Sequence, residues 1–327
     1  MENEIITLGH GSGAGLTREL ISDILKPTFD LLSLEDSVQI DENIVITTDS
    51  YVVNPLFFPG GNIGKLAVTG TVNDLAMKGA RPAFLMMAFI IEEGLPLKDF
   101  RKIVSSIAKA AKESQVKIVA GDTKVVEKNR GDGIFITSSG VGYLPKGMYL
   151  GTDRIKPGNK ILINGSIGDH AISVINARNN LGLEPAPKSD CASLHDLVIK
   201  ITETGKVNFL RDATRGGVAA IMNEVVQETG YGIIINEKNL PVKENIEAVC
   251  ELLGLDPLYL ANEGKLTVFA SDDHEDILRI MKKQETGKDS ALIGEVTDEF
   301  TGVFLRTEIG SLRPILMIDS DPLPRIC

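Results

Sequence analysis

The sequence contains no tryptophan, few cysteines and no apolar run long enough to cross a membrane as a helix. The longest apolar run, residues 84–91, has only the length of a strand. Cys191, Cys250 and Cys327 lie far apart, with no CxxC pair and no histidine at metal-ligand spacing, which argues against a zinc site or a disulfide framework. The first four residues, Met-Glu-Asn-Glu, carry net negative charge and no secretory-signal pattern. We therefore expect a protein of the reducing cytoplasm.

Basic residues are also scarce, because 34 Lys and Arg face 45 Asp and Glu and leave a net charge of −11. This balance argues against non-specific binding to nucleic acid or to an anionic membrane, both of which need basic patches. There is no GxxxxGK[ST] sequence and no GxGxxG following a strand, so neither a P-loop nor a Rossmann dinucleotide site is supported. A nucleotide could still be held by local positive charge or by a metal ion.

The order of predicted elements indicates two domains of α/β and α+β character. Strands are expected at 44–47, 84–91, 116–120, 133–144, 160–163, 232–236, 266–270 and 290–295. Helices are expected at 16–26, 63–78, 100–114, 193–205, 216–228, 244–253 and 273–284, the first ended by Pro27 and the third capped by Asp99. A turn at 156–158 restarts the pattern, which places the domains at 1–150 and 151–318, followed by a tail at 319–327.

Three aspartates, Asp49, Asp74 and Asp122, each follow an apolar stretch and stand beside small or hydroxyl residues. A ligand crevice commonly opens at such strand and helix ends. Carboxylates are the ligands that Mg²⁺ prefers, and Mg²⁺ usually bridges them to phosphate oxygens. Ordinary capping or turn chemistry is the competing interpretation for each aspartate.

Glycine-rich segments at 10–15, with Gly11 and Gly13, and at 60–64 could close their backbone N–H groups around phosphate oxygens, although tight turns explain them equally well. Lys124, directly after Thr123, could neutralise phosphate charge, and Arg215 stands where a helix is expected to begin. Glu263 precedes an apolar strand beside a glycine, as a general base could, or as an ordinary strand-edge residue does.

The tail ends in a thiol, Cys327, preceded by two prolines, Pro322 and Pro324, that keep its approach extended. Nine extended residues reach roughly 30 Å. Such a tail suits an arm that carries a chemical group into a site and out again. A frayed chain end with an idle cysteine is the simpler interpretation.

Several segments together resemble a known family, in the order in which that family has them. They lie at 48–64, 67–76, 121–125, 212–217 and 262–266, with His10-Gly-Ser-Gly13 near the start and Pro324-Arg-Ile-Cys327 at the end. The sequence resembles the aminoimidazole-ribonucleotide-synthetase (PurM-like) superfamily of ATP-dependent enzymes, and within it the HypE family, the carbamoyl dehydratases of hydrogenase maturation. The closing Pro-Arg-Ile-Cys discriminates this family from relatives that have no need of a C-terminal thiol.

The resemblance implies that a carbamoyltransferase partner, HypF, loads Cys327 with a carbamoyl group. ATP-dependent dehydration would then leave a thiocyanate, whose cyanide passes to a HypC–HypD scaffold complex for the iron centre of [NiFe] hydrogenases. Catalysis is implied for Cys327, Glu263 and Lys124, and Mg²⁺ binding for Asp49, Asp74 and Asp122. The remaining residues near the nucleotide would be Gly11, Gly13, Asp49, Asp74, Thr123 and Arg215.

The implied fold is a two-domain PurM-like fold, in which N-terminal strands form a barrel at a homodimer interface and the C-terminal tail is mobile. Ala14 and Asn62 depart from the family pattern, and Asn62 removes a possible acidic metal ligand. Two alternatives stay open: another PurM-like enzyme that acts on a small molecule, or a nucleotide-gated assembly scaffold without turnover. A thiol redox switch is disfavoured because no resolving cysteine stands near Cys327 in the sequence.

Overall fold

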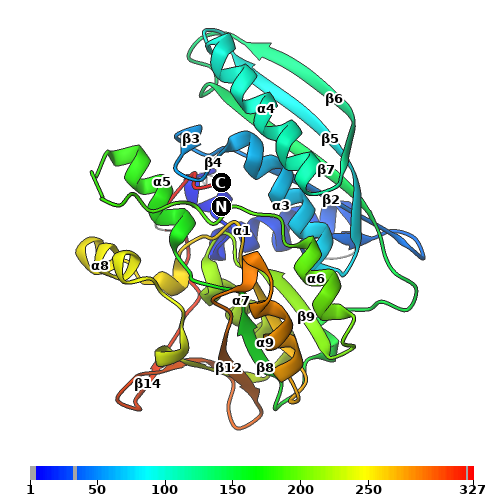
Figure 1. Cartoon of the computed structure of the whole chain (residues 1–327), viewed down its shortest axis with the longest axis vertical. Helices are drawn as coiled ribbons and strands as arrows, with labels where there is room; N and C mark the ends of the chain where they lie inside the picture. Colours follow the sequence, from blue (N-terminus) through cyan, green and yellow to red (C-terminus); the bar gives the residue numbers. More distant parts are fainter. Residues whose placement is uncertain (1–4, 32–34, 322) are drawn as a thin grey trace.

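A five-stranded and a seven-stranded sheet organise the part of the chain that the computed structural model describes, residues 5–31, 35–321 and 323–327. The five-stranded sheet belongs to the N-terminal half, at the top of Figure 1, and the seven-stranded sheet to the C-terminal half below it. Helices pack on both sheets. The expected organisation, in which each half of the chain combines a sheet with helices, is therefore confirmed.

The N-terminal sheet has the strand order β1-β2-β7-β5-β6, with β5 and β6 parallel and the other pairs antiparallel. Alternate residues of β2 and β7, such as Val45 and Ile136, are buried on the face that α3 covers. On the other face Thr48 and Ser50 meet Ser139 and Thr137 across the strands at 2.9 and 3.0 Å. The elements of the N-terminal half are β1 (Val38–Gln39), β2 (Ile44–Tyr51), β3 (Phe57–Phe58), β4 (Gly61–Asn62), α3 (Ile63–Met77), β5 (Arg81–Glu92), α4 (Leu97–Glu113), β6 (Lys117–Val126) and β7 (Ile134–Tyr143). Strands β3 and β4 pair with each other as a separate two-stranded sheet.

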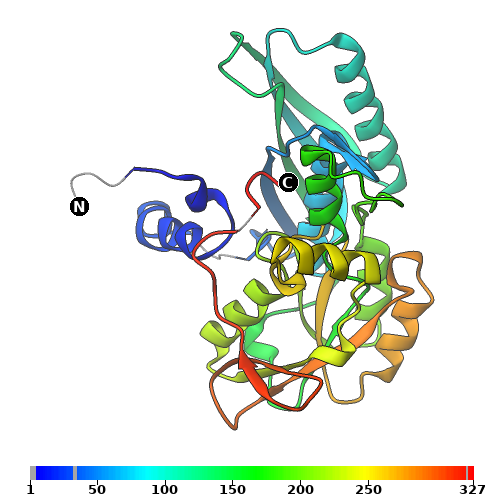
Figure 2. The same cartoon turned by 90° about the vertical axis from the view of Figure 1, so that its left-hand side faces the viewer.

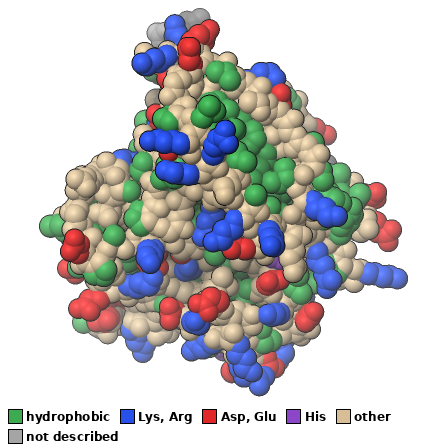
Figure 3. All heavy atoms as spheres, turned by 45° about the horizontal axis from the view of Figure 1, so that its top comes forward, with side chains coloured by type: hydrophobic (Ala, Val, Ile, Leu, Met, Phe, Trp, Pro, Cys, Tyr) green, Lys and Arg blue, Asp and Glu red, His purple; other side chains and the backbone are tan. Residues whose placement is uncertain are grey.

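Strand β6 lies at the edge of this sheet and is exposed over almost its whole length. Val119 and Val125 are 56% and 67% exposed, and Ile90 and Ile118 are also exposed. Figure 3, which brings the N-terminal half forward, shows hydrophobic side chains gathered across this part of the surface. A long exposed edge strand with apolar side chains is a template for pairing with another chain.

The C-terminal sheet has the order β14-β13-β10-β12-β8-β11-β9 and is covered on both faces. In β8, Ile161 and Ile163 pack in the same cluster as α7, whereas Leu162 packs with α6 and α9. Burial on both faces explains why inner strands such as β8 and β11 are mostly apolar. The elements are β8 (Lys160–Ile163), α5 (Asp169–Asn179), α6 (His195–Thr202), β9 (Val207–Asp212), α7 (Gly217–Thr229), β10 (Gly232–Asn236), α8 (Glu244–Leu253), β11 (Leu266–Ala270), α9 (Glu275–Lys282), β12 (Ala291–Thr297), β13 (Gly302–Arg306) and β14 (Leu312–Pro314).

Short 3₁₀ turns connect these elements at Leu8–Gly11, Thr152–Arg154, Glu237–Asn239, Pro257–Tyr259 and Glu285–Gly287. The first predicted helix differs from its expected end, because α1 (Gly15–Leu20), a π-helical turn η2 (Ile21–Leu25) and α2 (Lys26–Phe29) continue past Pro27. Pro27 stands in the first turn of α2, where its missing N–H costs little. Asp99 is not the N-cap of α4, since that helix begins at Leu97 and Asp99 lies in its first turn.

The C-terminal tail returns from the C-terminal sheet to the middle of the molecule. Figure 2 shows it, in red, passing the N-terminal helices and ending between the two halves. Gly15 and Leu16, at the start of α1, donate their backbone N–H groups to the carbonyls of Ile318 and Asp319 at 2.9 and 3.0 Å. Among the described residues, no helix is both long and apolar enough to cross a membrane.

Candidate active site

A cavity of about 320 Å³ lies where the two halves and the tail meet. Asp49 of β2 and Asp74 of α3 come from the N-terminal half, Arg215 and Glu263 from the C-terminal half, and Cys327 from the tail. Gly13 also lines it. Six of the residues that the sequence predicts for the site are thus brought to one cavity from segments far apart in the chain.

Glu263 is buried on the loop that precedes β11, and its backbone is hydrogen-bonded to the side chain of Asp190. The Asp190 carboxylate accepts the N–H groups of Glu263 and Gly264 at 3.1 and 3.3 Å, and Lys265 Nζ lies 3.0 Å from it. Burial, with Asp212, Asp190 and Asp49 nearby, raises the pKa of Glu263 well above its ordinary value, against the opposing charge of Arg215. A carboxyl with a raised pKa is suited to accept a proton near neutral pH.

Carboxylates from both halves of the molecule crowd the cavity. Burial raises the pKa of Asp74 well above its usual range, and Asp212, Asp49 and Asp36 add to the shift. Burial similarly raises the pKa of Asp212, with Asp36 as the next cause, although Arg211 opposes it. Burial also raises the pKa of Asp36 to about 6, even though Arg211 Nε lies 3.0 Å from its carboxylate. The cavity therefore has more carboxyl groups than its two arginines, Arg211 and Arg215, can pair with.

Oxygen donors under such mutual repulsion fit a hard divalent cation. Within the described ranges, however, no group of three or more His, Cys, Asp or Glu side chains is arranged to hold a metal ion by itself. The donor set therefore fits an ion that takes part of its coordination from a substrate, as Mg²⁺ does when it binds phosphate oxygens.

Arg215 approaches the glycine-rich N-terminal segment directly. Its Nη1 donates to the carbonyl of Gly11 at 2.9 Å. Gly13 has a positive φ of 77°, and a Cβ at this position would lie 2.6 Å from the Cβ of Arg215. Only glycine allows this backbone shape and this approach. Gly11 itself lines a neighbouring cavity of about 280 Å³, which shares Arg215 and Cys327 with the first.

The last residues of the tail are docked in the site. Val52 N–H donates to the carbonyl of Cys327 at 3.0 Å, and Asn54 N–H donates to that of Arg325 at 3.2 Å. Burial raises the pKa of the half-buried Cys327 thiol well above its usual range; Arg215 opposes the shift, and Glu263 and Asp49 add to it. Burial also raises the pKa of Cys191 to about 12 and of Cys250 to about 11, so neither is an activated thiol.

Asp122, Thr123 and Lys124 do not line the cavity, because they lie on the exposed edge strand β6. In register across the sheet, Asp49 of β2 is level with Gly121 of β6, with β7 and β5 between them. Three strand spacings amount to about 14 Å, and Asp122, one residue on, faces the opposite side of the sheet. Lys124 Nζ binds Asp122 at 2.6 Å instead. Within this chain, these three residues therefore lie away from Asp49.

The second glycine-rich segment, 60–64, is used for turn and cap geometry. Gly60 packs against Ser189, and the Asn62 side chain caps α3 by accepting the N–H groups of Gly64 and Lys65. Sequence reasoning missed Asp36, Arg211 and Asp212, which also line the cavity. Asp212 is the first residue of the motif at 212–217 and Arg211 directly precedes it, so this motif was the available signal for both. Nothing in the sequence singled out Asp190.

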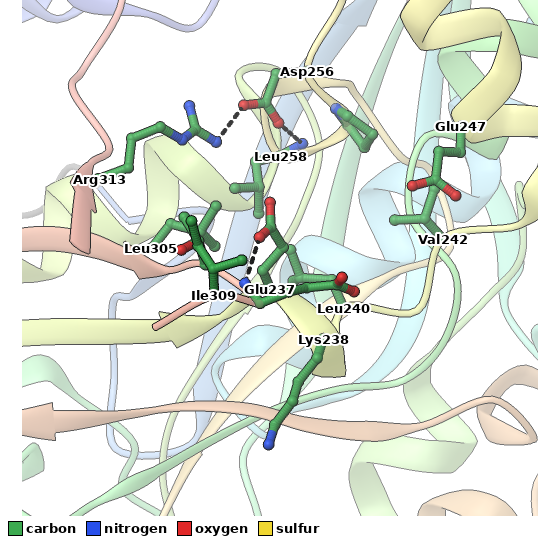
Figure 4. Close-up of a pocket in the computed structure, with 13 residues that line it drawn as sticks. Glu237, Lys238, Leu240, Val242, Glu247, Asp256, Leu258, Leu305, Ile309 and Arg313 are labelled. Carbon is green, nitrogen blue, oxygen red and sulfur yellow. Dashed lines mark hydrogen bonds and ion pairs between the residues drawn. The ribbon is translucent and has the colours of Figure 1, made fainter. Parts of the chain in front are cut away.

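A second large cavity, of about 650 Å³, lies in the C-terminal half, away from Cys327 (Figure 4). It is lined in part by Glu237, Leu258 and Ile309, and Asp256 on its wall is paired with Arg313 at 3.0 Å. None of the residues predicted for the site lines it. The chemistry that the sequence predicts is therefore concentrated in the cavity at Cys327.

Comparison with known proteins first defines the class of the chain. Residues 34–144 match the family "AIR synthase related protein, N-terminal domain", and residues 156–305 match "AIR synthase related protein, C-terminal domain". The chain is thus a two-domain α/β protein of the AIR synthase related, PurM-like class. The expected fold class is confirmed to that extent.

Individual relatives narrow the class. The carbamoyl dehydratase HypE of Azotobacter vinelandii is 43% identical over 336 residues, covering 100% of this chain and 98% of that protein. A crystal structure of a HypE–HypF complex contains a chain that is 49% identical, with a TM-score of 0.89 and coverage of 91% and 99%. A structure of HypE in complex with ATP is 40% identical, with a TM-score of 0.84 and coverage of 99% and 100%. The chain belongs to the HypE family of carbamoyl dehydratases.

Proposed function

We propose that this protein dehydrates a carbamoyl group on its own Cys327 to a thiocyanate in an ATP-dependent reaction, and so supplies cyanide for the iron centre of [NiFe] hydrogenases. The observation that carries the proposal is that Cys327 lines the same cavity as Glu263, Arg215 and the crowded aspartates. The family to which the chain belongs and the ATP complex of a relative support it.

The proposed reaction proceeds in two steps. The carbamoyl oxygen attacks the γ-phosphorus of ATP, ADP leaves, and the nitrogen gives up one proton. The C–O bond then breaks, phosphate leaves with the electron pair of that bond, and the nitrogen gives up its second proton, so that a C≡N group remains on sulfur. Because an amide oxygen is a poor leaving group, phosphorylation is what makes the second step possible.

We assign the residues of the cavity to parts of this reaction. Glu263 accepts a proton from the nitrogen, for which its raised pKa suits it. Arg215 stabilises negative charge on the phosphoryl group. Asp49 and Asp74 would hold Mg²⁺, which supplies charge neutralisation at the phosphates. Gly11 and Gly13 lie on the segment that Arg215 contacts and would lie close to the nucleotide.

We further propose that the tail, residues 319–327, leaves the cavity between reaction steps. The docked thiol is a poor nucleophile because burial raises its pKa and the nearby carboxylates oppose its ionisation. Cys327 therefore receives its carbamoyl group while the tail is undocked and lies in the site of a carbamoyltransferase such as HypF. Delivery of cyanide to a HypC–HypD scaffold requires the same exit. The rest of the chain would form the domains 1–150 and 151–318.

The exposed strand β6 supports a homodimer in which the two N-terminal sheets form a barrel. We propose that Asp122, Thr123 and Lys124 then complete the site of the other subunit, Asp122 as a further Mg²⁺ ligand and Lys124 near the reacting phosphate. This arrangement is testable by mixing subunits. Asp49→Asn and Lys124→Ala variants, each inactive alone, should regain activity when mixed, since some heterodimers carry one intact site. If the two residues serve one subunit, mixing restores nothing.

The direct test of the function uses Cys327→Ala beside Cys250→Ala as a matched control, because Cys250 is a buried cysteine that lines neither cavity at the tail. Cys327→Ala should lose all thiocyanate formation and keep ATP binding. Cys250→Ala should keep both. ATP-dependent dehydration that survives Cys327→Ala would favour a small-molecule enzyme. If Cys327→Ala still supports hydrogenase assembly and no thiocyanate forms in either protein, the nucleotide-gated scaffold would be favoured.

A further inference from the structure

We infer that Arg178 and His170, both on α5, are positioning residues that hold the terminal peptide of the tail and thereby place the Cys327 sulfur in the cavity. Figures 1 and 2 both show the chain end beside α5. The inference rests on the proposed function for its purpose, although the docking itself can be measured independently of catalysis.

Arg178 uses all three guanidinium nitrogens on backbone carbonyls, two in the docked tail and one in the loop that follows β2. Nη1 donates to Pro324 O at 2.9 Å, Nη2 to Arg325 O at 2.7 Å, and Nε to Asn54 O at 2.7 Å. Since Asn54 N–H also donates to Arg325 O, the guanidinium bridges both sides of this pairing. Burial lowers the pKa of Arg178, with Arg325 as the next cause, yet an arginine stays charged at any ordinary pH. Its bonds to the carbonyls are charge-assisted and stronger than neutral ones.

His170 fixes the next peptide group. Its Nε2 lies 2.8 Å from Ile326 O, and its Nδ1 lies 2.8 Å from Ser189 Oγ. A carbonyl can only accept, so Nε2 carries the proton, and in the neutral ring Nδ1 accepts from the Ser189 hydroxyl. Burial lowers the pKa of His170, which keeps the ring neutral at physiological pH. Every polar atom of the ring therefore has a partner only while the tail is docked.

The remaining bonds fix the direction of the last residues. Arg325 has a left-handed backbone with φ of 57°, and this turns Ile326 and Cys327 inward. Its side chain donates from Nε to Val52 O at 3.1 Å and forms an ion pair with Asp132. Ile326 is buried in a hydrophobic cluster that joins the N-terminal half to α5 and α8. A non-glycine residue in this conformation is held by its surroundings, here by Arg178 and its partners.

The same network reaches Glu263. Ser189 Oγ, which pairs with His170, also accepts Cys191 N–H at 3.1 Å, and Asp190 between them accepts the Glu263 N–H. The segment packs closely on two glycines, because a Cβ on Gly60 would lie 2.7 Å from Ser189 O and one on Gly264 would lie 2.1 Å from Asp190 O. One segment thus contacts both the residue that holds the tail and the backbone of the proposed base.

The test measures the alkylation rate of Cys327 by iodoacetamide in the full-length protein, read by peptide mapping. Cys191 and Cys250 are buried and serve as internal references for unfolding. Arg178→Ala should speed alkylation of Cys327 by about 10-fold or more, which corresponds to about 1.4 kcal/mol of lost docking free energy. Arg178→Lys should restore only part of the protection of Cys327, because a lysine ammonium cannot reach all three carbonyls that the planar guanidinium binds. Arg279→Ala, an exposed arginine on α9 paired with Asp276, should react like the wild type.

A second pair of variants, at His170, tests the hydrogen bond to the tail separately from the volume of the side chain. Gln carries an N–H close to the place of Nε2, so His170→Gln should keep Cys327 protected, whereas His170→Leu should expose it. If His170 only filled space, the two variants should give similar alkylation rates of Cys327. The inference is overturned if Arg178→Ala alkylates at the wild-type rate while correctly folded, or if the wild-type thiol reacts as fast as in the denatured chain. Failure of the proposed function would instead appear as protected Cys327 without thiocyanate formation.

Discussion

Asp190→Asn is expected to destabilise the protein strongly although it changes one atom. The Asp190 carboxylate and Lys265 form an ion pair at 3.0 Å in which the side chains are only 4% and 10% exposed. Removing one partner of a buried pair leaves the other charge unpaired, which costs about 3–5 kcal/mol. The asparagine amide also keeps only one acceptor oxygen, so one of the Glu263 and Gly264 N–H groups loses its partner. At roughly 2–4 °C per kcal/mol for a domain of this size, the melting temperature should fall by about 6–20 °C.

The assay is thermal unfolding at pH 7 followed by far-ultraviolet circular dichroism, since the chain has no tryptophan to report by fluorescence. Asp272→Asn is the matched control, because its carboxylate is 86% exposed and 3.6 Å from Lys160, and it should change stability by less than about 0.5 kcal/mol. Adding Lys265→Met to Asp190→Asn should recover part of the loss. A loss no larger than that of Asp272→Asn would refute the reasoning.

The effect of Asp190→Asn should also depend on pH. Burial acts to raise the pKa of Asp190, but Lys265, His170 and the Glu263 N–H together lower it below its ordinary value. A group whose pKa is lowered by folding stabilises the protein above its unfolded pKa, and that stability disappears as pH falls through its folded pKa. The difference between wild type and Asp190→Asn should therefore be full at pH 7 and shrink in acid.

Two further predictions concern the cavity. Glu263→Gln should keep carbamoylation of Cys327 and slow dehydration by about 100-fold or more, the usual scale for a general base; single-turnover measurement at the wild-type rate would exclude Glu263 as the base. Asp74→Asn should raise the melting temperature of the metal-free protein at pH 7 while weakening Mg-ATP binding, because folding raises the pKa of Asp74 and so costs stability once pH exceeds its unfolded value. An unchanged or lower melting temperature for Asp74→Asn would contradict the proposed charge crowding.

The sequence predicted strands and helices well where periodicity was strong. Residues 232–236, 266–270 and 244–253 were predicted with the bounds observed for β10, β11 and α8. Helix α5 (Asp169–Asn179) was missed, although Asn164-Gly165 is a turn dipeptide and Ser166 stands three residues before Asp169. That omission hid His170 and Arg178, which the sequence left without a role. A helix buried on several sides shows no amphipathic period from which to infer it.

The cavity was predicted in outline, since Asp49, Asp74, Arg215, Glu263 and Cys327 meet there. Their meeting depends on contacts between residues hundreds of positions apart, which local pattern cannot supply. The separation of Asp122 from Asp49 likewise follows from strand order and register, β2-β7-β5-β6, and from which face each side chain takes. Spacing along the chain carries no information about that order.

The most direct test of the account is the intact mass of the protein after incubation with carbamoyl phosphate, Mg-ATP and a carbamoyltransferase partner, followed by mapping of the C-terminal peptide. The account predicts a carbamoyl adduct on Cys327 that loses the mass of one water only when ATP is present. An adduct on Cys327 that never loses water in the presence of bound ATP, or no adduct there at all, would contradict it.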